Sequence, residues 1–231
     1  MMNKYQAAID FAVIGLGRFG TALAQSLAAT GKEVLVIDTK EERVEAVRDY
    51  VAHGIIATQL DKQALQEAGI ANCDTVIVCV GSEGLESSIL TTLNVIDLGV
   101  PRVIAKAISQ EHGSVLERIG AQVVYPEKDM ALRLSHTLVN SHTLDYIRLS
   151  ENDSIVEIKV SEKYDGVSIL QADIRKKYHL NIIAVIKEKE IISVVKPETL
   201  LNDGDRIIVI GDNEHINHFE SVMSTNKKSI I

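Results

Sequence analysis

Apolar runs and amphipathic segments alternate through the first half of the chain. Short, almost wholly apolar runs predict six strands, at residues 11–14, 33–37, 54–57, 75–80, 102–107 and 122–125. Between them, apolar residues three and four positions apart predict helices, at residues 18–30, 40–50, 61–69, 86–98 and 114–119. Strands that are apolar on both faces are typical of a parallel sheet covered by helices on each side. The pattern therefore predicts an α/β fold, a Rossmann-like doubly wound parallel sheet.

A different pattern begins at Pro126. Proline suits the first turn of a helix, and Glu127 and Asp129 favour the positive end of its dipole. An apolar stripe through Leu134 and Leu138 predicts one long helix that runs through residue 146. Nothing in the preceding sheet requires this helix, so we expect residues 127–148 to form a crossover or dimerisation element.

The last third of the chain predicts a small α+β domain. Alternating apolar and charged positions at residues 156–160 are typical of a half-buried strand. Further strands are expected at residues 182–186, 191–195 and 206–210, with helices at residues 169–178 and 214–223. We therefore divide the chain into residues 1–126, 127–148 and 149–224, followed by a disordered tail at residues 225–231.

Composition and charge exclude several classes of protein. The 231 residues are 46% hydrophobic, which is ample for a core, and the formal net charge of −8 argues against nucleic acid as a partner. No apolar segment approaches the roughly 20 residues that a membrane helix needs. Two cysteines, Cys73 and Cys79, are too few for a disulfide framework. We expect a cytosolic protein with two buried thiols.

The first predicted strand runs into a glycine-rich turn. Gly15, Gly17 and Gly20 have the G-x-G-x-x-G spacing, between a strand and a helix, and Asp38 ends the next strand about 20 residues on. Backbone N–H groups and a helix dipole meet at such a turn, which suits a phosphate, and the acid suits a ribose hydroxyl. Gly81 and Ser82 follow the fourth strand on the same side of the sheet. Three loops therefore converge on one nucleotide-binding site.

No catalytic group accompanies this turn. The seven histidines are scattered without metal-ligand spacing, and neither cysteine has a flanking histidine or basic residue to activate it. Two alternatives to a non-catalytic nucleotide sensor remain, an NAD-dependent dehydrogenase or reductase and a stand-alone redox sensor that binds NADH. The dehydrogenase would need a catalytic His, Lys or Tyr and a larger substrate domain.

Three segments carry a family resemblance. The glycine turn with Asp38, the segment Pro126-Glu-Lys-Asp-Met130, and a C-terminal pattern at residues 154–160, 181–187 and 203–211 resemble RCK (regulator of K⁺ conductance) proteins of the TrkA family. These are the cytosolic gating subunits of Ktr and Trk potassium uptake systems, and the chain is most similar to the KtrA branch. The resemblance covers residues from about 9 to 223.

The resemblance implies an assembly and its ligands. Family members form a homo-octameric ring, a tetramer of dimers, docked under a membrane K⁺ transporter of the KtrB or TrkH type. The ring is therefore expected in the cytoplasm, peripheral to the inner face of the membrane. Each N-terminal domain would bind ATP or ADP, and NAD(H) in many members, with ATP favouring the conducting ring. Cyclic di-AMP binds between paired C-terminal domains in many Gram-positive members.

The resemblance also assigns roles to individual residues. Arg18 would reach the terminal phosphate, Glu127 would hold Mg²⁺ or Ca²⁺ at the intradimer interface, and Lys106 would lie in the same neighbourhood. Residues expected at the nucleotide are Gly15, Leu16, Gly17, Arg18, Phe19, Gly20, Asp38, Thr39, Thr58, Gln59, Leu60, Gly81, Ser82 and Lys106. Residues expected at cyclic di-AMP are Ile182, Ile183, Ile186 and Lys187.

One loop departs from the family pattern. Thr58-Gln59-Leu60 stands where the family commonly has Asp/Asn-Ala-Thr, which leaves the preference for base and ribose open. The charged residues agree with the implied roles on physical grounds. An arginine in the glycine turn can distinguish a nucleotide with an additional phosphate. A glutamate near a triphosphate is unfavourable unless a cation lies between them, which is the reason to expect a divalent ion at Glu127.

Overall fold

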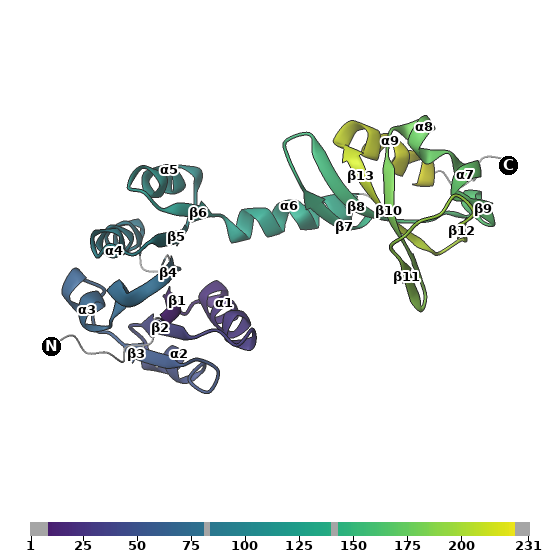
Figure 1. Cartoon of the computed structure of the whole chain (residues 1–231). Coiled ribbons are helices and arrows are strands. Elements are labelled where there is room, and N and C mark those ends of the chain that lie inside the picture. The colour runs from purple at the N-terminus through teal and green to yellow at the C-terminus, as the bar shows by residue number, and fades with distance from the viewer. Residues whose placement is uncertain (1–8, 81–83, 140–142, 225–231) are drawn as a thin grey trace. The chain divides into compact units, whose positions relative to one another are not determined.

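The computed structural model describes residues 9–80, 84–139 and 143–224, and the chain divides into two compact units (Figure 1). The first unit is Met1–Glu127 and the second is Lys128–Ile231. Each unit has its own hydrophobic core. Residues 81–83 and the expected tail at 225–231 lie outside the described residues.

The first unit is built on a six-stranded parallel sheet with the order β3-β2-β1-β4-β5-β6. Its strands are β1 (Ile9–Ile14), β2 (Val34–Asp38), β3 (His53–Ile56), β4 (Cys73–Val78), β5 (Arg102–Lys106) and β6 (Gln122–Val124). The order reverses between β1 and β4, which lie side by side in parallel register. The predicted doubly wound sheet is confirmed.

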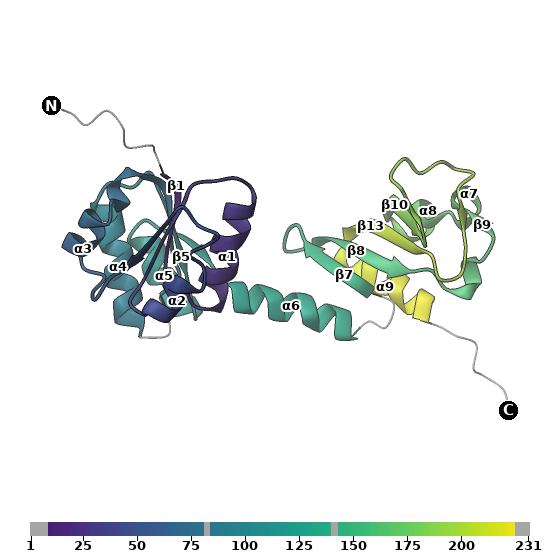
Figure 2. The ribbon, with the colours of Figure 1, turned by 90° about the horizontal axis from the view of Figure 1, so that it is seen from below.

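Helices cover both faces of this sheet, as Figure 2 shows. The helices are α1 (Arg18–Ala29), α2 (Glu41–Glu45), α3 (Lys62–Glu67), α4 (Leu85–Asp97) and α5 (Gln110–Arg118), with a 3₁₀ turn η1 (Ile70–Asn72) before β4. Helices α1 and α2 pack on one face, over Val13 and Val36. Helices α3, α4 and α5 pack on the other, over Ile14 and Val76. Successive strand residues point to opposite faces, so the inner part of β1, Phe11–Ile14, must be apolar at every position to serve both cores.

The predicted long helix is shorter than expected. Helix α6 spans Pro126–Val139, and Thr143–Arg148 forms the strand β7. The prediction of one helix through residues 127–148 is therefore wrong in its second half. Strand β7 pairs antiparallel with β8 (Asp153–Lys159), with Tyr146 opposite Val156. Pairing with a neighbouring strand satisfies the backbone of this segment and outweighs the helical spacing of its apolar residues.

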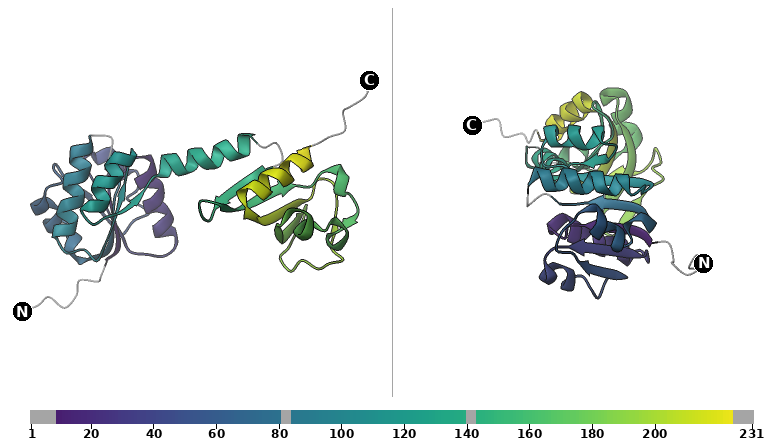
Figure 3. Two further views of the ribbon diagram at one scale, coloured as in Figure 1. Left: turned by 90° about the horizontal axis from the view of Figure 1, so that it is seen from above. Right: turned by 90° about the vertical axis from the view of Figure 1, so that its left-hand side faces the viewer.

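The second unit contains a five-stranded antiparallel sheet with the order β11-β10-β13-β8-β7, and a two-stranded sheet of β12 and β9. The remaining strands are β9 (Val167–Ser168), β10 (Asn181–Lys187), β11 (Glu190–Ile192), β12 (Leu200–Leu201) and β13 (Arg206–Asp212). Helix α9 (Asn213–Ser224), yellow in Figure 3, packs its buried Phe219 and Met223 against β8 and β13. The expected α+β domain is thus present, with β7 as an additional edge strand.

Several predicted elements differ in extent. The helix expected at residues 169–178 is two short helices, α7 (Ile169–Ala172) and α8 (Ile174–Tyr178), broken where Asp173 adopts a left-handed conformation with φ 51°. Helix α2 ends at Glu45 and strand β11 at Ile192, earlier than the patterns predict, while α5 begins earlier, at Gln110. A short 3₁₀ turn, η2 (Glu162–Tyr164), follows β8. Across the described part of the chain, no helix has both the length and the apolar character to cross a membrane.

Candidate functional site

The glycine turn joins β1 to α1 through two very close backbone approaches. Gly15 has φ +95°, and a Cβ on it would lie 2.9 Å from the Val80 nitrogen on the neighbouring loop. A Cβ on Gly20 would lie 2.0 Å from the Gly15 carbonyl oxygen, so the first turn of α1 fits only without a side chain. Gly17, at the N-cap, faces open space, because a Cβ there would have nothing within 4 Å of it. Two glycines therefore build the turn, and the third leaves room for a ligand.

The N-terminus of α1 is suited to an anion. The first turn of this 12-residue helix contains no acidic residue, and Arg18 at its start is exposed. Unpaired N–H groups and the helix dipole make such an end electropositive. The open side of Gly17 is where a phosphate could approach these groups.

Asp38 fastens the turn to the end of β2. Its carboxylate is 3% exposed, and Oδ2 accepts the Leu16 N–H at 2.6 Å while Oδ1 accepts the Lys40 N–H at 2.9 Å. Arg43 Nη1 lies 3.4 Å from Oδ2 and balances the buried charge. Bonds from backbone N–H groups to a carboxylate are among the stronger ones in proteins. Asp38 thus holds the glycine turn in shape.

A small cavity, of about 30 Å³, opens between the carboxyl ends of β1, β2 and β4. It is lined by Gly15, Gly17, Asp38, Thr39, Arg43, Leu60, Cys79 and Val80. Five of the residues predicted at the nucleotide therefore meet here, from three separate loops. Leu16, Phe19, Gly20, Thr58 and Gln59 do not line it, and Gly81 and Ser82 lie outside the described residues.

Sequence reasoning missed three residues of this cavity, Arg43, Cys79 and Val80. Arg43 could have been found from the sequence. It lies five residues after Asp38, in the first turn of the helix that follows β2. Val80 and Cys79 end the fourth apolar run, so the topological rule for parallel sheets also points to them.

Arg18, Lys106 and Glu127 form a charged group near this cavity. Lys106 Nζ donates to Glu127 Oε1, and the lysine side chain is 15% exposed whereas the glutamate is 64% exposed. The hydrogen bond from Lys106, and with it the positive charges of Lys106 and Arg18, hold the pKa of Glu127 below its usual range. The three residues that the resemblance assigns to the terminal phosphate and its cation are therefore neighbours.

Cys79 connects the charged group to the cavity. Burial raises the pKa of its thiol to about 12, while the charge of Lys106 acts to lower that pKa and the charge of Glu127 to raise it. Lys106 and Glu127 therefore lie near enough to Cys79, a residue of the cavity lining, for their charges to act on it. Cys73 is buried as well, and its pKa is raised to about 11. Both thiols are free and protonated at neutral pH, as expected.

Glu127 has too few neighbours to bind a divalent ion alone. Within residues 9–80, 84–139 and 143–224, no three His, Cys, Asp or Glu side chains form a group that could hold a metal. Carboxylate, phosphate and water oxygens are the ligands that Mg²⁺ and Ca²⁺ prefer. A cation at Glu127 would therefore take its other ligands from a nucleotide, from water or from a second copy of the chain.

The residues expected at cyclic di-AMP are separated by the structure. Ile182 lines a cavity of about 400 Å³ in the second unit, but Ile183 is exposed and Ile186 is buried. Lys187 is tied into the domain, because its Nζ donates to Asp205 at 2.9 Å and to the Leu200 carbonyl at 3.2 Å. The cavity is lined by Ile169, Leu170, Asp173, Ile174, Arg175, Leu180, Asn181, Ile182, Val195, Lys196 and Pro197. The sequence pattern did not predict Arg175 as a residue of this cavity.

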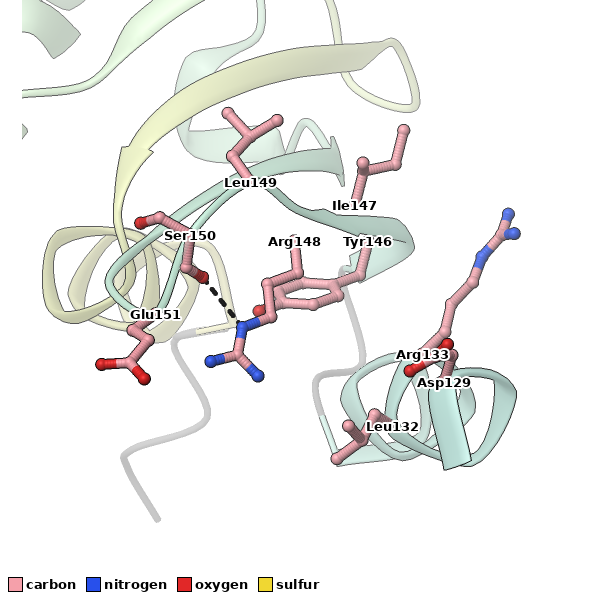
Figure 4. A pocket seen from close by; sticks show the side chains of 9 residues that line it. All are labelled: Asp129, Leu132, Arg133, Tyr146, Ile147, Arg148, Leu149, Ser150 and Glu151. Atoms are coloured by element: carbon pink, nitrogen blue, oxygen red, sulfur yellow. Dashed lines mark hydrogen bonds between the residues drawn. The ribbon is translucent and has the colours of Figure 1, made fainter. Parts of the chain in front are cut away.

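A larger open cavity, of about 650 Å³, lies between α6 and the end of β7 (Figure 4). Leu132, Ile147 and Leu149 give it an exposed apolar lining, and Arg148 donates through Nε to the Ser150 carbonyl at 2.8 Å. Arg133, on α6, makes two 2.8 Å hydrogen bonds to Asp145, on β7. This bidentate pair fixes the two elements to one another.

The chain matches two family models, the TrkA-N domain at residues 11–126 and the TrkA-C domain at residues 154–224. It is 41% identical to the Ktr system potassium uptake protein C of Bacillus subtilis (strain 168), over 91% of this chain and 96% of that relative. It is 38% identical to the Ktr system potassium uptake protein A of the same organism, over 92% and 96%.

A solved structure has the same fold at low identity. The GsuK channel bound to NAD superimposes with a TM-score of 0.63 at 18% identity, over 98% of this chain and 43% of that longer chain. The glycine turn, the parallel sheet and both family models agree on one assignment. The chain belongs to the TrkA family of RCK proteins, the regulatory subunits of Ktr and Trk potassium uptake systems.

Proposed function

We propose that this chain senses the phosphate number of an adenine nucleotide and gates a membrane potassium transporter accordingly. It would work in the cytoplasm, held at the inner face of the membrane by a transporter partner of the KtrB or TrkH type. Two relatives that it matches along 91% and 92% of its length are named as Ktr potassium uptake proteins. The observation that carries the proposal is the cavity at the glycine turn, with Arg18 and Lys106 close to it.

Arg18 and Lys106 give ATP and ADP different affinities. The additional phosphate of ATP brings negative charge that two cations can meet, and it reaches farther from the glycine turn than ADP does. A ligand gates only if it binds two conformations unequally, since equal affinity shifts nothing. Arg18 and Lys106 are thus the part of the site that can convert the exchange of ADP for ATP into a change of conformation.

Calorimetry on single variants tests this reading. Arg18→Ala should weaken ATP about tenfold more than it weakens ADP, because a lost charge-assisted bond is worth about 1.5–3 kcal/mol and only ATP makes it. Arg48→Ala is the matched control, since Arg48 is an exposed arginine of the same unit that pairs with Glu45. Equal losses for ATP and ADP would remove Arg18 from the sensing role.

A divalent cation would join Glu127 to the nucleotide. Lys106 now neutralises Glu127, and a triphosphate would compete for that lysine and leave the carboxylate facing negative charge. Mg²⁺ or Ca²⁺ between the two resolves the repulsion. Glu127→Gln should therefore reduce the dependence of potassium flux on the divalent cation. A cation response equal to that of the unmodified protein would contradict this role.

NAD(H) is a second ligand for the same turn. The GsuK structure of the same fold contains NAD, and the glycine turn and Asp38 of this chain suit a dinucleotide as well as ATP. Competition calorimetry distinguishes the two ligands, because a dinucleotide that binds here must be displaced by ATP. Turnover of NADH with any substrate would favour the alternative of a dehydrogenase.

Exposed apolar side chains support assembly into a ring. Leu90 and Leu93 on α4 and Val115 on α5 are exposed on the first unit, and Leu134 and Leu138 are exposed on α6. Such surfaces are typical of contacts between copies. We propose that they build homodimers and, from these, the homo-octamer. Light scattering should give an octamer, and Leu90→Glu should give a smaller species while Tyr50→Glu, also exposed, should not.

The cavity that Ile182 and Arg175 line in the second unit suits cyclic di-AMP. Leu170, Ile182 and Pro197 offer an apolar surface to an adenine, and Arg175 offers a guanidinium to a phosphate. A cavity of about 400 Å³ is too small for the whole dinucleotide, which agrees with a site shared between paired domains. Arg175→Ala should abolish binding in calorimetry, whereas Lys187→Ala should leave it unchanged because Lys187 is engaged by Asp205. The opposite pattern would restore the site expected from the sequence.

A further inference from the structure

Two histidines of the second unit face each other across two helices. His179 ends α8, and His215 lies in the first turn of α9. Their ring centroids are 5.1 Å apart and the ring planes are tilted by 43°. Both side chains are exposed, and in the described part of the chain neither imidazole makes a hydrogen bond. Nothing in the nucleotide sites uses this pair.

The separation of the rings matches that of two imidazoles on one metal ion. Zinc lies about 2.0–2.1 Å from an imidazole nitrogen, which places the metal about 3.2 Å from the ring centroid. Two such rings at a tetrahedral angle have centroids about 5.2 Å apart.

The backbone holds the pair in place. His179 has φ 56°, a left-handed conformation that is uncommon for residues other than glycine. The end of β13, directly before α9, approaches it closely, since a Cβ on Gly211 would lie 3.4 Å from the His179 carbonyl oxygen and 2.6 Å from the Leu180 side chain. The start of α9, which carries His215, is therefore held against the end of α8. Ligands fixed by the fold lose little freedom when an ion binds.

We propose that His179 and His215 form a binding site for a divalent transition-metal ion such as Zn²⁺, Ni²⁺ or Cu²⁺. Neutral imidazole suits these ions, and the Irving–Williams order predicts that Cu²⁺ binds most tightly. The described residues offer no third His, Cys, Asp or Glu for the cluster, so water completes the coordination. His218, one turn further along α9, packs instead against Tyr178 at a ring distance of 5.7 Å.

A metal at this site would clip α8 to α9. Helix α8 carries Arg175, which lines the cavity of about 400 Å³ that also contains Ile182. An ion that binds only the folded domain stabilises it by mass action. The metal would therefore fix the helix that presents Arg175, independently of any nucleotide in the first unit.

Calorimetry with ZnCl₂ on the tag-free, full-length protein at pH 7.5 tests the site. We expect one ion for each chain. His179→Asn and His215→Asn should each weaken binding at least about tenfold, since even the loss of an outer-sphere partner costs that much in characterised sites. Asparagine tolerates the left-handed conformation at position 179, so the fold should persist, which circular dichroism checks. His218→Asn is the matched control and should bind as the unmodified protein does.

Four results would overturn the proposal. They are no binding to the folded protein, an affinity unaffected by His179→Asn, an affinity unaffected by His215→Asn, and an equal loss in His218→Asn, which would indicate diffuse binding to surface histidines. The affinity should also be lower at pH 6 than at pH 7.5, because a metal ion competes with protons for imidazole ligands. An affinity that is the same at pH 6 and pH 7.5 would exclude imidazole ligands.

Discussion

At the scale of single residues, the glycines of the turn have different tasks that mutation can separate. Gly20 has no room for a side chain, because a Cβ would meet the Gly15 carbonyl at 2.0 Å, whereas Gly17 faces open space. Gly20 is therefore a requirement of the fold, and Gly17 is a requirement of the ligand. The same motif thus combines a packing constraint with a binding constraint.

Gly20→Ala and Gly17→Ala should affect different measurements. We expect Gly20→Ala to lower the free energy of unfolding by about 1–3 kcal/mol, because the turn must open to admit the methyl group. Gly17→Ala should cost less, about 0.5–1 kcal/mol for the loss of a favoured N-cap residue, but should weaken ATP, whose phosphates need that space. Urea unfolding and calorimetry on both variants check this. Equal loss of stability in the two variants would contradict the division of tasks.

The thiols give a second prediction at this scale. Burial raises the pKa of Cys73 to about 11 and that of Cys79 to about 12, against about 8.5 for an unfolded cysteine. Alkylation by iodoacetamide at pH 8 should therefore be at least about a hundredfold slower in the native protein than in urea. Since the unfolded thiols release protons that the folded ones keep, stability should also fall as the pH rises above about 9. Rapid native alkylation would contradict the burial.

Only part of the site could be predicted from the sequence. Gly15, Gly17 and Asp38 were accessible because their spacing follows from the geometry of a strand, a turn and a helix. Arg43 escaped because its role depends on a side chain reaching back to Asp38. The C-terminal residues were placed by resemblance alone, and the register of β10 decides that Ile186 points into the core and Lys187 toward Asp205. Register depends on pairing between distant segments, which no local pattern specifies.

At the scale of elements, local patterns predicted most strands and helices and failed where two elements meet. The apolar spacing of Thr143–Arg148 continues the helical pattern of α6, but this segment pairs with β8 as a strand. The helix predicted from Ile169 is interrupted at Asp173. Apolar spacing identifies the face that is buried, whereas a change of chain direction depends on the partner that receives it. The strand β7 and the break were therefore beyond the sequence pattern.

The break at Asp173 yields a prediction for this element. Its φ of 51° suits glycine better than any residue with a Cβ, so Asp173→Gly should be more stable than Asp173→Ala by about 1 kcal/mol. Lys176, inside α8, is the matched control, because there alanine should exceed glycine by about 0.5–1 kcal/mol. Urea unfolding of the four variants measures both differences. If the glycine variant were the more stable at both positions 173 and 176, or the alanine variant at both, the left-handed break at Asp173 would be contradicted.

At the scale of the whole molecule, two units with separate cores imply separate responses to a ligand. The first unit has a core on each side of its sheet, and the second has one around Phe219. The nucleotide cavity at the glycine turn is built from the first unit alone. A ligand there stabilises directly only the unit that binds it.

Calorimetric melting should therefore show two transitions. ATP at about a hundred times its dissociation constant should raise one of them by about 10 °C, because such saturation adds about 2.7 kcal/mol to the stability of the first unit. The other transition should move by less than about 1 °C, and Gly17→Ala should abolish the shift. A single cooperative transition that ATP moves as a whole would show that the two units unfold together.

Helix α6 begins at the charged group, because Glu127 is its second residue. It starts with Pro126 and Glu127 in the first unit and continues from Lys128 into the second, as one rod of 14 residues. At about 1.5 Å for each residue the rod is about 21 Å long, so a pivot of about 10° at its base displaces its tip by about 4 Å. That travel exceeds the length of a hydrogen bond, about 2.9 Å. In the gating that we propose, an exchange of ionic partners at Glu127 would act at the base of this helix, where a small change of angle produces its largest displacement at the far end.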